Sequence, residues 1–316
     1  MNGRVAATPR SLSGGHPALD RLAEHGLDVV FPAPGRLPSP EEQLATVPGC
    51  VAYLAGVEPI RADLLRACPS LKVIARNGTG VDNIDLVAAE SLGIRVERAA
   101  GANAQGVAEL AVGLILAAFR QLPWSDARLK AGAWQRRPGR ELAGRTLGVV
   151  GLGQIGRRVA AIGSAIGMRV VGHDAFPDPA WRPHDGWLSL DDLLASADVV
   201  TLHAPPAARP LVDAAGLARM RDGAVLVNTA RAELVDDGAV LDALNSGRLA
   251  TYAVDAFATE PPTDLRLVRH DKVIATPHIG GFTRESIERA TDEAVSAILR
   301  GLGLPAGQPE RVCSGV

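Results

Sequence analysis

Three polar side chains with complementary chemistry follow apolar, strand-like runs in the second half of the chain: Arg231, Glu260 and His278. Ligands in open α/β sheets bind outside the carboxyl ends of the strands, so we expect these residues to meet at one edge. Histidine titrates near neutrality and is the usual base for a hydroxyl proton, and a bonded glutamate would fix its tautomer. Arginine offers a planar fork for a carboxylate and polarises a carbonyl. The set suits oxidation of a secondary alcohol that bears a carboxylate.

Each of the three residues also has a purely structural interpretation. Arg231 can be a surface arginine, Glu260 before Pro261 a loop charge, and His278 a buried structural histidine. We favour the catalytic interpretation because the three occur together, each at a strand end of the same series.

A glycine-rich turn precedes this set. Gly151-Leu-Gly-Gln-Ile-Gly156 follows an apolar strand and opens a helix. The first glycine permits a tight turn, the second lets a pyrophosphate approach the backbone, and the third lets helix and strand pack closely. The alternative is a turn needed only for packing. The strand and helix on either side favour a dinucleotide site, with Gln154 and Ile155 completing the loop.

An acidic residue completes the dinucleotide pattern. Asp174 ends the next strand, 18 residues after Gly156. A carboxylate there can bind both ribose hydroxyls of the adenosine half and would repel a 2′-phosphate, which predicts NAD rather than NADP as the cofactor. A solvated strand end is the simpler alternative for Asp174.

The elements that must position these residues alternate along almost the whole chain. Apolar runs predict strands at Arg4–Ala7, Asp28–Phe31, Val51–Ala55, Leu71–Arg76, Ile94–Glu97, Thr146–Val150, Met168–His173, Val199–His203, Ala224–Asn228, Thr251–Asp255 and Val273–Thr276. Helical patterns include Pro17–His25, Arg61–Ala67, Leu86–Leu92, Ala104–Leu122, a segment after Pro123, Gln154–Ile166, Leu190–Ala195, Asp237–Ser246 and Thr283–Gly301. This rhythm predicts an α/β fold with parallel strands and helical crossovers.

Further motifs carry a family resemblance. They are Arg76-Asn-Gly-Thr-Gly-Val-Asp-Asn-Ile-Asp85, Asn103 with Val107-Ala-Glu109, and Glu141-Leu-Ala-Gly-Arg-Thr-Leu-Gly148. With the motifs above, the chain resembles the D-isomer-specific 2-hydroxyacid dehydrogenases from about Val51 to Ile298, and within them the phosphoglycerate dehydrogenase group. The resemblance implies two doubly wound parallel-sheet domains, with a Rossmann NAD-binding domain (residues 102–282) inserted in a flavodoxin-like substrate domain (residues 1–101 and 283–316). It also implies a homodimer.

The resemblance assigns roles to individual residues. His278 would be the acid/base, Glu260 its partner, and Arg231 the ligand of the substrate carboxylate and carbonyl. Asp255 would contact the nicotinamide carboxamide, and backbone amides at Asn77 and Gly78 would hold the carboxylate. Further cofactor contacts are expected at Thr79, His203, Ala204, Thr229 and Gly281, and further substrate contacts at Arg76, Asn103 and Arg136.

The identity of the substrate stays open at this stage. Ala55 stands where phosphoglycerate dehydrogenases carry an arginine that meets a phosphate. Arg76, Arg136 and Arg137 suggest a second anionic group on the substrate, although solvated arginines are an equal alternative. A glyoxylate or hydroxypyruvate reductase would generally prefer NADP, which Asp174 opposes. An NAD-sensing corepressor of the same fold would keep the same motifs.

Composition limits the remaining classes of protein. The formal net charge is −2, so the sequence indicates no general affinity for nucleic acid or acidic membranes. The longest apolar run, about Ala108–Phe119, predicts a buried helix, and the N-terminus lacks a signal-peptide pattern.

Three scattered cysteines (Cys50, Cys68 and Cys313) show no metal-ligand spacing and predict reduced thiols in a cytoplasmic protein. The chain is expected to lack the regulatory domains of longer family members.

Overall fold

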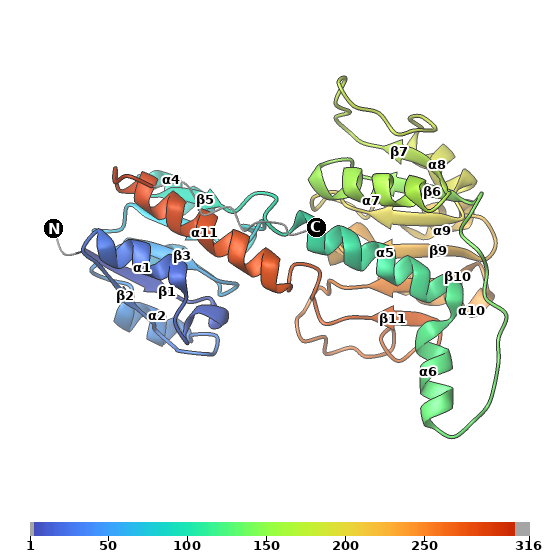
Figure 1. The fold of residues 1–316 in the computed structure, drawn as a ribbon, viewed down its shortest axis with the longest axis horizontal. Helices are drawn as coiled ribbons and strands as arrows, with labels where there is room; N and C mark the ends of the chain where they lie inside the picture. The colour runs from blue at the N-terminus through green and yellow to red at the C-terminus, as the bar shows by residue number, and fades with distance from the viewer. Residues whose placement is uncertain (1–2, 307–316) are drawn as a thin grey trace. The chain divides into compact units, whose positions relative to one another are not determined.

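The computed structural model describes residues 3–306, and the chain divides into two compact units. The first comprises the described residues up to Asn103 together with those from Thr283 onward, and the second is Ala104–Phe282. Each unit is built on one parallel sheet, as Figure 1 shows. Cys313 lies outside the described residues.

The first unit has a five-stranded sheet in the order β2-β1-β3-β4-β5. Its strands are β1 (Gly3–Ala7), β2 (Leu27–Val30), β3 (Cys50–Ala55), β4 (Val73–Arg76) and β5 (Arg95–Arg98). The helices are α1 (Pro17–Glu24), α2 (Pro40–Thr46), α3 (Ala62–Arg66), α4 (Leu86–Ser91) and α11 (Arg284–Gly301), with a 3-10 turn at Arg10–Leu12. Helices α1 and α11 pack on one face, and α3 and α4 pack on the other. This strand order is that of flavodoxin-like sheets.

The second unit has a six-stranded sheet in the order β11-β10-β9-β8-β6-β7. Its strands are β6 (Thr146–Val150), β7 (Arg169–His173), β8 (Val199–Leu202), β9 (Ala224–Asn228), β10 (Leu249–Val254) and β11 (Val273–Ala275). The helices are α5 (Ala104–Arg120), α6 (Leu122–Lys130), α7 (Gln154–Ala165), α8 (Leu190–Ser196), α9 (Ala214–Arg219) and α10 (Asp237–Ser246), with a 3-10 turn at Ala232–Leu234. Strand β7 lies on one side of β6, and β8 lies on the other side. The strand order therefore reverses between β6 and β8.

Burial explains why the central strands of the second unit are almost wholly apolar. Leu147 and Val149 of β6 pack with α5 and α7 on one face of the sheet. Val150 faces the opposite core, which α8, α9 and α10 cover. A parallel sheet with helices on both faces buries both sides of each strand, which removes the alternation of polar and apolar residues.

The strands predicted from the sequence are all present, with ends that differ by at most two residues. Two short helices, α2 and α9, were not predicted. Helix α2 begins with a capping box in which Ser39 accepts from the Glu42 amide and the Glu42 side chain accepts from the Ser39 amide. At α9, the Asp213 side chain accepts from the Gly216 amide.

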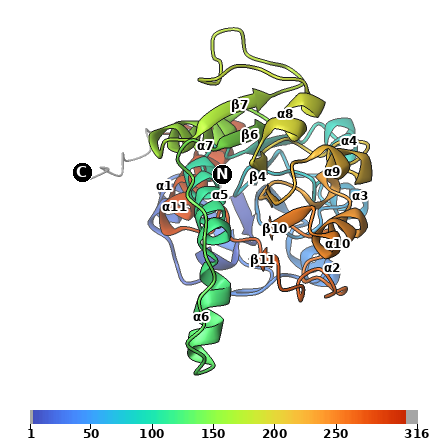
Figure 2. The same ribbon diagram turned by 90° about the vertical axis from the view of Figure 1, so that its right-hand side faces the viewer.

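The prediction that the second long helix starts after Pro123 was wrong. Helix α6 begins at Leu122 and includes Pro123 in its first turn. Backbone N–H groups in the first turn of a helix make no hydrogen bond within the helix, so proline is tolerated there. Gln121, with φ of 55°, separates α5 from α6. Helix α6 buries none of its residues and extends away from the sheet of its unit (Figures 1 and 2).

Within the described residues, no single helix is long and apolar enough to cross a membrane. The pair α5 and α6 passes that test only when joined, and it is bent by 64°. The apolar residues of α5 are buried in the core of the second unit, which accounts for their number.

Candidate active site

The glycine turn after β6 packs against the chain that follows β8. Gly151 has φ of 88°, and a Cβ there would lie 2.6 Å from the Ala204 nitrogen. A Cβ on Gly156 would lie 2.0 Å from the Gly151 carbonyl oxygen, whereas one on Gly153 would meet nothing within 4 Å. The first and third glycines therefore serve packing, and the second faces open space at the point where the strand order reverses.

Asp174 ties the end of β7 to this turn. Its Oδ2 accepts the Leu152 amide at 2.7 Å, and its Oδ1 accepts the Phe176 amide at 2.9 Å. Each carboxylate oxygen has two acceptor positions, so one on each remains for a further donor. Asp174 can therefore hold the turn and still receive the two hydroxyls of a ribose.

Two other residues at this edge have buried polar atoms without partners among the described residues. His203 has its Nε2 2.9 Å from Thr201 Oγ1, while its Nδ1 has no hydrogen-bond partner, and Thr229 Oγ1 has none either. Burial lowers the pKa of His203 to about 3, so the ring is neutral. Buried polar atoms are usually satisfied, and a ligand in this position would supply the partners. The glycine turn, Asp174, His203 and Thr229 thus fit a dinucleotide.

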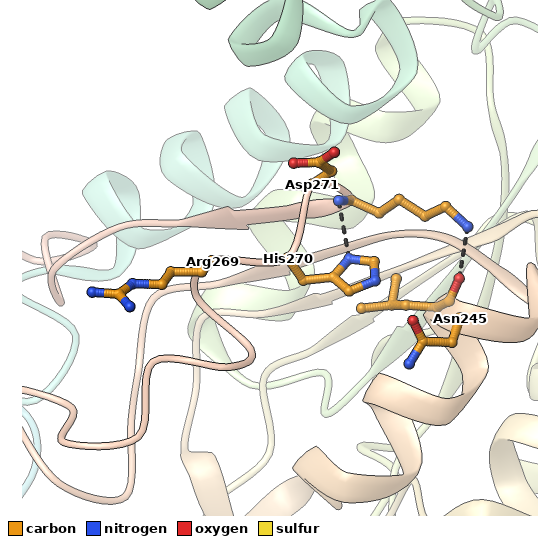
Figure 3. A pocket seen from close by; sticks show the side chains of 6 residues that line it. Asn245, Arg269, His270 and Asp271 are labelled. Atoms are coloured by element: carbon orange, nitrogen blue, oxygen red, sulfur yellow. Dashed lines mark hydrogen bonds between the residues drawn. The ribbon is translucent and has the colours of Figure 1, made fainter.

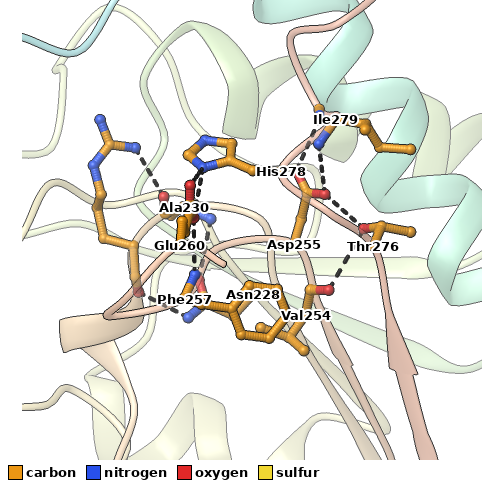
Figure 4. A network of polar contacts seen from close by, with 11 residues as sticks. Asn228, Ala230, Val254, Asp255, Phe257, Glu260, Thr276, His278 and Ile279 are labelled. Atoms are coloured by element: carbon orange, nitrogen blue, oxygen red, sulfur yellow. Dashed lines mark hydrogen bonds and ion pairs between the residues drawn. The ribbon is translucent and has the colours of Figure 1, made fainter. Parts of the chain in front are cut away.

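His278 and Glu260 form a close pair beyond β10 and β11. The imidazole Nδ1 lies 2.8 Å and 2.9 Å from the two Glu260 carboxylate oxygens, as Figure 4 shows. The Phe257 amide also donates to Glu260 Oε1 at 3.1 Å, which fixes the carboxylate. With Nδ1 facing Glu260, Nε2 is the nitrogen left to exchange a proton with a substrate. The pairing expected from the sequence is therefore present in the geometry.

The backbone that carries His278 is strained and is held by a buried acid. His278 has φ of 52°, a conformation uncommon for a residue other than glycine. Asp255 is only 1% exposed; its Oδ1 accepts from Thr276 Oγ1 at 2.6 Å and from the Ile279 amide at 2.8 Å. Its Oδ2 accepts the Gly280 amide at 2.8 Å. Asp255 therefore organises the turn that presents His278, and its contact with a nicotinamide stays a prediction. Gly281 follows, partly exposed.

Arg231 is presented by a turn that a buried asparagine shapes. Asn228, at the end of β9, accepts the Ala230 amide at 3.1 Å and donates to the Arg231 carbonyl at 2.8 Å. The Asp255 amide donates to the Asn228 carbonyl at 3.0 Å, which links this turn to the end of β10. Arg231, Glu260 and His278 thus follow β9, β10 and β11, which are neighbours in the sheet.

The predicted substrate residues of the first unit lie at the carboxyl end of β4 and, for Asn103, after β5. Thr79 Oγ1 donates to Asn103 Oδ1 at 2.8 Å, and Arg76 Nη1 donates to the Asn77 carbonyl. The Asn77 amide donates to the Ala55 carbonyl at 2.9 Å and the Gly78 amide to the Arg76 carbonyl at 2.8 Å. Both amides donate to carbonyls within the chain, and their contact with a substrate carboxylate stays a prediction.

Arg136 belongs to the second unit. It is exposed in the segment after α6, where its neighbour Arg137 stacks on the Trp124 ring at 4.1 Å. Trp124 lines a groove with Arg269, His270, Asp271 and Val273, which lie at the amino end of β11. This groove therefore lies at the edge of the sheet opposite His278, and the contact of Arg136 with a substrate stays a prediction.

The pocket drawn in Figure 3 lies at that same opposite edge. It has a volume of about 390 Å³ and is lined by Leu244, Asn245, Arg269, His270, Asp271 and Lys272. These residues end α10 and precede β11, whereas ligands in such sheets bind at the carboxyl ends of strands. None of the predicted site residues lines this pocket.

Glu58 is a buried acid that the sequence reasoning missed. It is fully buried in the first unit, where it accepts from the Thr8 hydroxyl and, at 3.1 Å, from the Gly56 amide. Its neighbours Gly56 and Pro59 predict an exposed loop, so no local signal marks its burial. Thr8 and Glu58 follow β1 and β3, between which the strand order of this sheet reverses.

Comparison with known proteins agrees with this geometry. Residues 112–280 match the family model described as "D-isomer specific 2-hydroxyacid dehydrogenase, NAD binding domain". The chain is 43% identical over 270 residues to D-3-phosphoglycerate dehydrogenase of Mycobacterium bovis, a match that covers 83% of this chain and 51% of that protein. It therefore spans about half the length of that relative.

Two further proteins match over most of their own length. The hydroxypyruvate reductase of Thermotoga maritima is 39% identical over 261 residues, covering 80% of this chain and 85% of that protein. The crystal structure of a Thermus thermophilus protein superposes with a TM-score of 0.88 at 38% identity, covering 97% of this chain and 99% of that one.

Proposed function

Because the chain belongs to the D-isomer-specific 2-hydroxyacid dehydrogenase family, we propose that it interconverts a small D-2-hydroxy acid and the corresponding 2-oxo acid with NAD. The observation that carries this proposal is the His278–Glu260 pair at 2.8 Å, with Arg231 on the neighbouring strand end. A proton carrier and a carboxylate ligand are the two groups that this reaction requires from the protein.

In the oxidation direction, His278 Nε2 would take the hydroxyl proton while the C2–H bond breaks. Bound NAD would accept the two electrons and the hydrogen as a hydride. Glu260 would hold the imidazole through Nδ1 and stabilise the imidazolium that forms. Arg231 would bind the carboxylate and polarise the developing carbonyl.

We assign cofactor binding to Ala104–Phe282. The glycine turn and the amino end of α7 would receive the pyrophosphate, with Gly151, Gly153, Gln154, Ile155 and Gly156 lining it. Asp174 would bind the ribose hydroxyls, and His203, Ala204, Thr229, Asp255 and Gly281 would line the remainder. In the discontinuous unit, we assign Thr79 to the cofactor and Arg76, Asn77, Gly78 and Asn103 to the substrate.

The substrate would carry a second anionic group beyond its carboxylate. The similarity to phosphoglycerate dehydrogenase and the position of Arg76 at the carboxyl end of β4 support this. Ala55, which pairs with Arg76 in the sheet, supplies no charge of its own. A hydroxypyruvate-reducing activity is the second candidate, because the match to the Thermotoga enzyme covers 85% of that protein.

Turnover assays test the proposal. The native chain should reduce NAD with at least one of D-glycerate, D-lactate, D-malate and D-3-phosphoglycerate, and the L-isomers should be inactive. His278→Ala should lose about 10²–10⁴-fold in kcat and still bind NAD, because it removes the proton carrier alone. A His278→Ala variant with half the native rate would reject the assignment. Equal kcat/KM for lactate and for every dianionic substrate would reject the second anion.

We also propose a cytoplasmic homodimer. Leu122, Leu129 and Trp134 on and after α6 are large apolar side chains left exposed by the single chain, which supports a partner copy. Cys50 and Cys68 are free thiols, as suits a reducing compartment. Sedimentation equilibrium should give twice the chain mass, and a monomer at micromolar concentration would refute the dimer.

A further inference from the structure

Phe176 is the most exposed large apolar side chain in the described part of the chain, at 91%. It lies in the segment between β7 and α8, which projects from its unit in Figures 1 and 2. Single exposed apolar side chains are common and need no explanation by themselves. Phe176 differs from the others because its backbone is held by Asp174, the predicted ligand of the ribose.

The backbone of Phe176 is fixed on both sides. Its amide donates to Asp174 Oδ1 at 2.9 Å. Pro177 follows, which restricts the chain, and Asp178 Oδ1 then accepts the Ala180 amide at 2.9 Å. An exposed ring on an ordered backbone is available to a ligand at little entropic cost.

Arg157 fastens this segment to the glycine turn. Its Nε donates to the Leu152 carbonyl at 2.8 Å, and its Nη2 pairs with Asp178 at 2.8 Å. The guanidinium also lies 5.2 Å from the centre of the Trp181 ring. Asp174 accepts the Leu152 amide, and Arg157 donates to the Leu152 carbonyl. These hydrogen bonds join the glycine turn and the Phe176 segment into one rigid framework.

This framework fixes the backbone of Phe176 two residues after Asp174, the predicted ligand of the ribose. The acceptor positions left on Asp174 suit a ribose diol, and a base is attached to the carbon next to the 2′-hydroxyl. The base of a ribose bound there would lie close to Asp174, and Phe176 is two residues away along a fixed backbone. We propose that the Phe176 ring stacks on the adenine of the bound dinucleotide and contributes much of the affinity for the adenosine half.

The proposal predicts a definite loss of affinity on removal of the ring. Stacking of a base on an aromatic side chain corresponds to about 5- to 150-fold in the dissociation constant. Phe176→Ala should therefore raise the Kd of ADP-ribose and of NAD by a factor in that range. Because the ring is exposed, the melting temperature of the ligand-free protein should not change.

Calorimetric titration of the full chain with ADP-ribose tests this without reference to turnover. Phe176→Tyr, which keeps a ring, should bind within about threefold of the native protein, whereas Phe176→Leu should lose most of what Phe176→Ala loses. Val87→Ala, which removes an exposed apolar side chain from α4, is the matched control and should bind normally.

Two results would overturn the proposal. Phe176→Ala binding ADP-ribose within twofold of the native protein excludes a stacking role, and equal binding by Phe176→Leu and Phe176→Tyr shows apolar contact without stacking. The assay measures binding alone, so a chain that binds ADP-ribose but oxidises no hydroxy acid would refute the proposed function and leave this inference standing.

Discussion

At the scale of single residues, the buried carboxylate of Asp255 holds the turn that presents His278. Asp255→Asn replaces an acceptor oxygen by an amide nitrogen that faces an N–H donor, so at least one hydrogen bond of the turn is lost. A hydrogen bond to a charged group corresponds to about 1.5–3 kcal/mol, so kcat should fall about 10- to 150-fold. Steady-state kinetics measures this.

A double-mutant cycle separates positioning from other roles of Asp255. If Asp255 acts through His278, then Asp255→Asn should have little further effect on the residual rate of His278→Ala. ADP-ribose affinity should be unchanged. A selective loss of NAD affinity with kcat intact would instead identify the nicotinamide contact as the main role of Asp255.

Asp174 carries the predicted choice between NAD and NADP. A carboxylate and a 2′-phosphate about 4 Å apart repel by roughly 1–4 kcal/mol at surface dielectrics, which is about tenfold to several hundredfold in affinity. Asp174→Asn removes the charge and should narrow the ratio of the two dissociation constants. Competitive titration measures both, and equal affinities in the native protein would contradict the prediction.

We expect His203 to make the stability of the fold fall with falling pH. Its pKa is about 3 in the folded chain because burial disfavours the charged ring, whereas an unfolded chain protonates below about pH 6.5. Between these values the unfolded state binds more protons, so the free energy of unfolding falls as the pH falls, by up to about 1.4 kcal/mol per pH unit.

Urea unfolding at pH 7.5 and pH 5.5 measures this effect. His203→Gln cannot take up the proton, so its loss of stability between the two pH values should be smaller by about 1 kcal/mol. The same loss in both proteins would show that other groups set the acid response.

At the scale of elements, Gly156 and Gly153 of the same motif differ in the space that surrounds them. Gly156→Ala places a Cβ about 2.0 Å from the Gly151 carbonyl oxygen, so helix α7 must shift, and we expect a loss of about 1–3 kcal/mol. In Gly153→Ala the added Cβ meets no atom within 4 Å, and the φ of −72° suits alanine. The free energy of unfolding should therefore stay unchanged, while the affinity for ADP-ribose falls. Chemical denaturation and titration of both variants test this, and the reverse pattern would contradict it.

The same turn shows what a sequence can and cannot predict. Strands such as β6 are continuous apolar runs between turns, and this local signal was sufficient for the strand positions and the order of βα units. The sequence also placed Arg231, Glu260 and His278 after strands. Other features depend on contacts between distant segments, which sequence spacing does not encode. They are the hydrogen bonds of Asp255 to the His278 turn, those of Asn228 to the Arg231 turn, and the burial of Glu58.

At the scale of the whole molecule, the two units differ in continuity. Ala104–Phe282 is one uninterrupted segment with its own two cores, so we expect it to fold alone and bind ADP-ribose. Residues 3–103 alone lack α11, whose Ala294, Val295 and Ile298 are buried against the first sheet, so this segment should not fold. Circular dichroism and thermal melting of the two fragments measure the difference.

A third fragment serves as the control. Residues 3–103 joined to 283–306 by a short glycine-serine linker should regain a cooperative melt, because Arg289 near the start of α11 donates to the Ala102 carbonyl at 2.9 Å and so brings the two ends close. Folding of residues 3–103 without α11 would show that the helix is dispensable.

The late position of α11 has a consequence for biosynthesis. The strands of the first sheet leave the ribosome early, but the helix that covers one of its faces follows roughly 180 residues later. At about 5–20 residues per second, this leaves a delay of about 10–40 s. During that time Leu54 and Val73 lack the cover that α11 gives them in the finished protein. A pause in translating the inserted unit lengthens the time for which this apolar face is exposed.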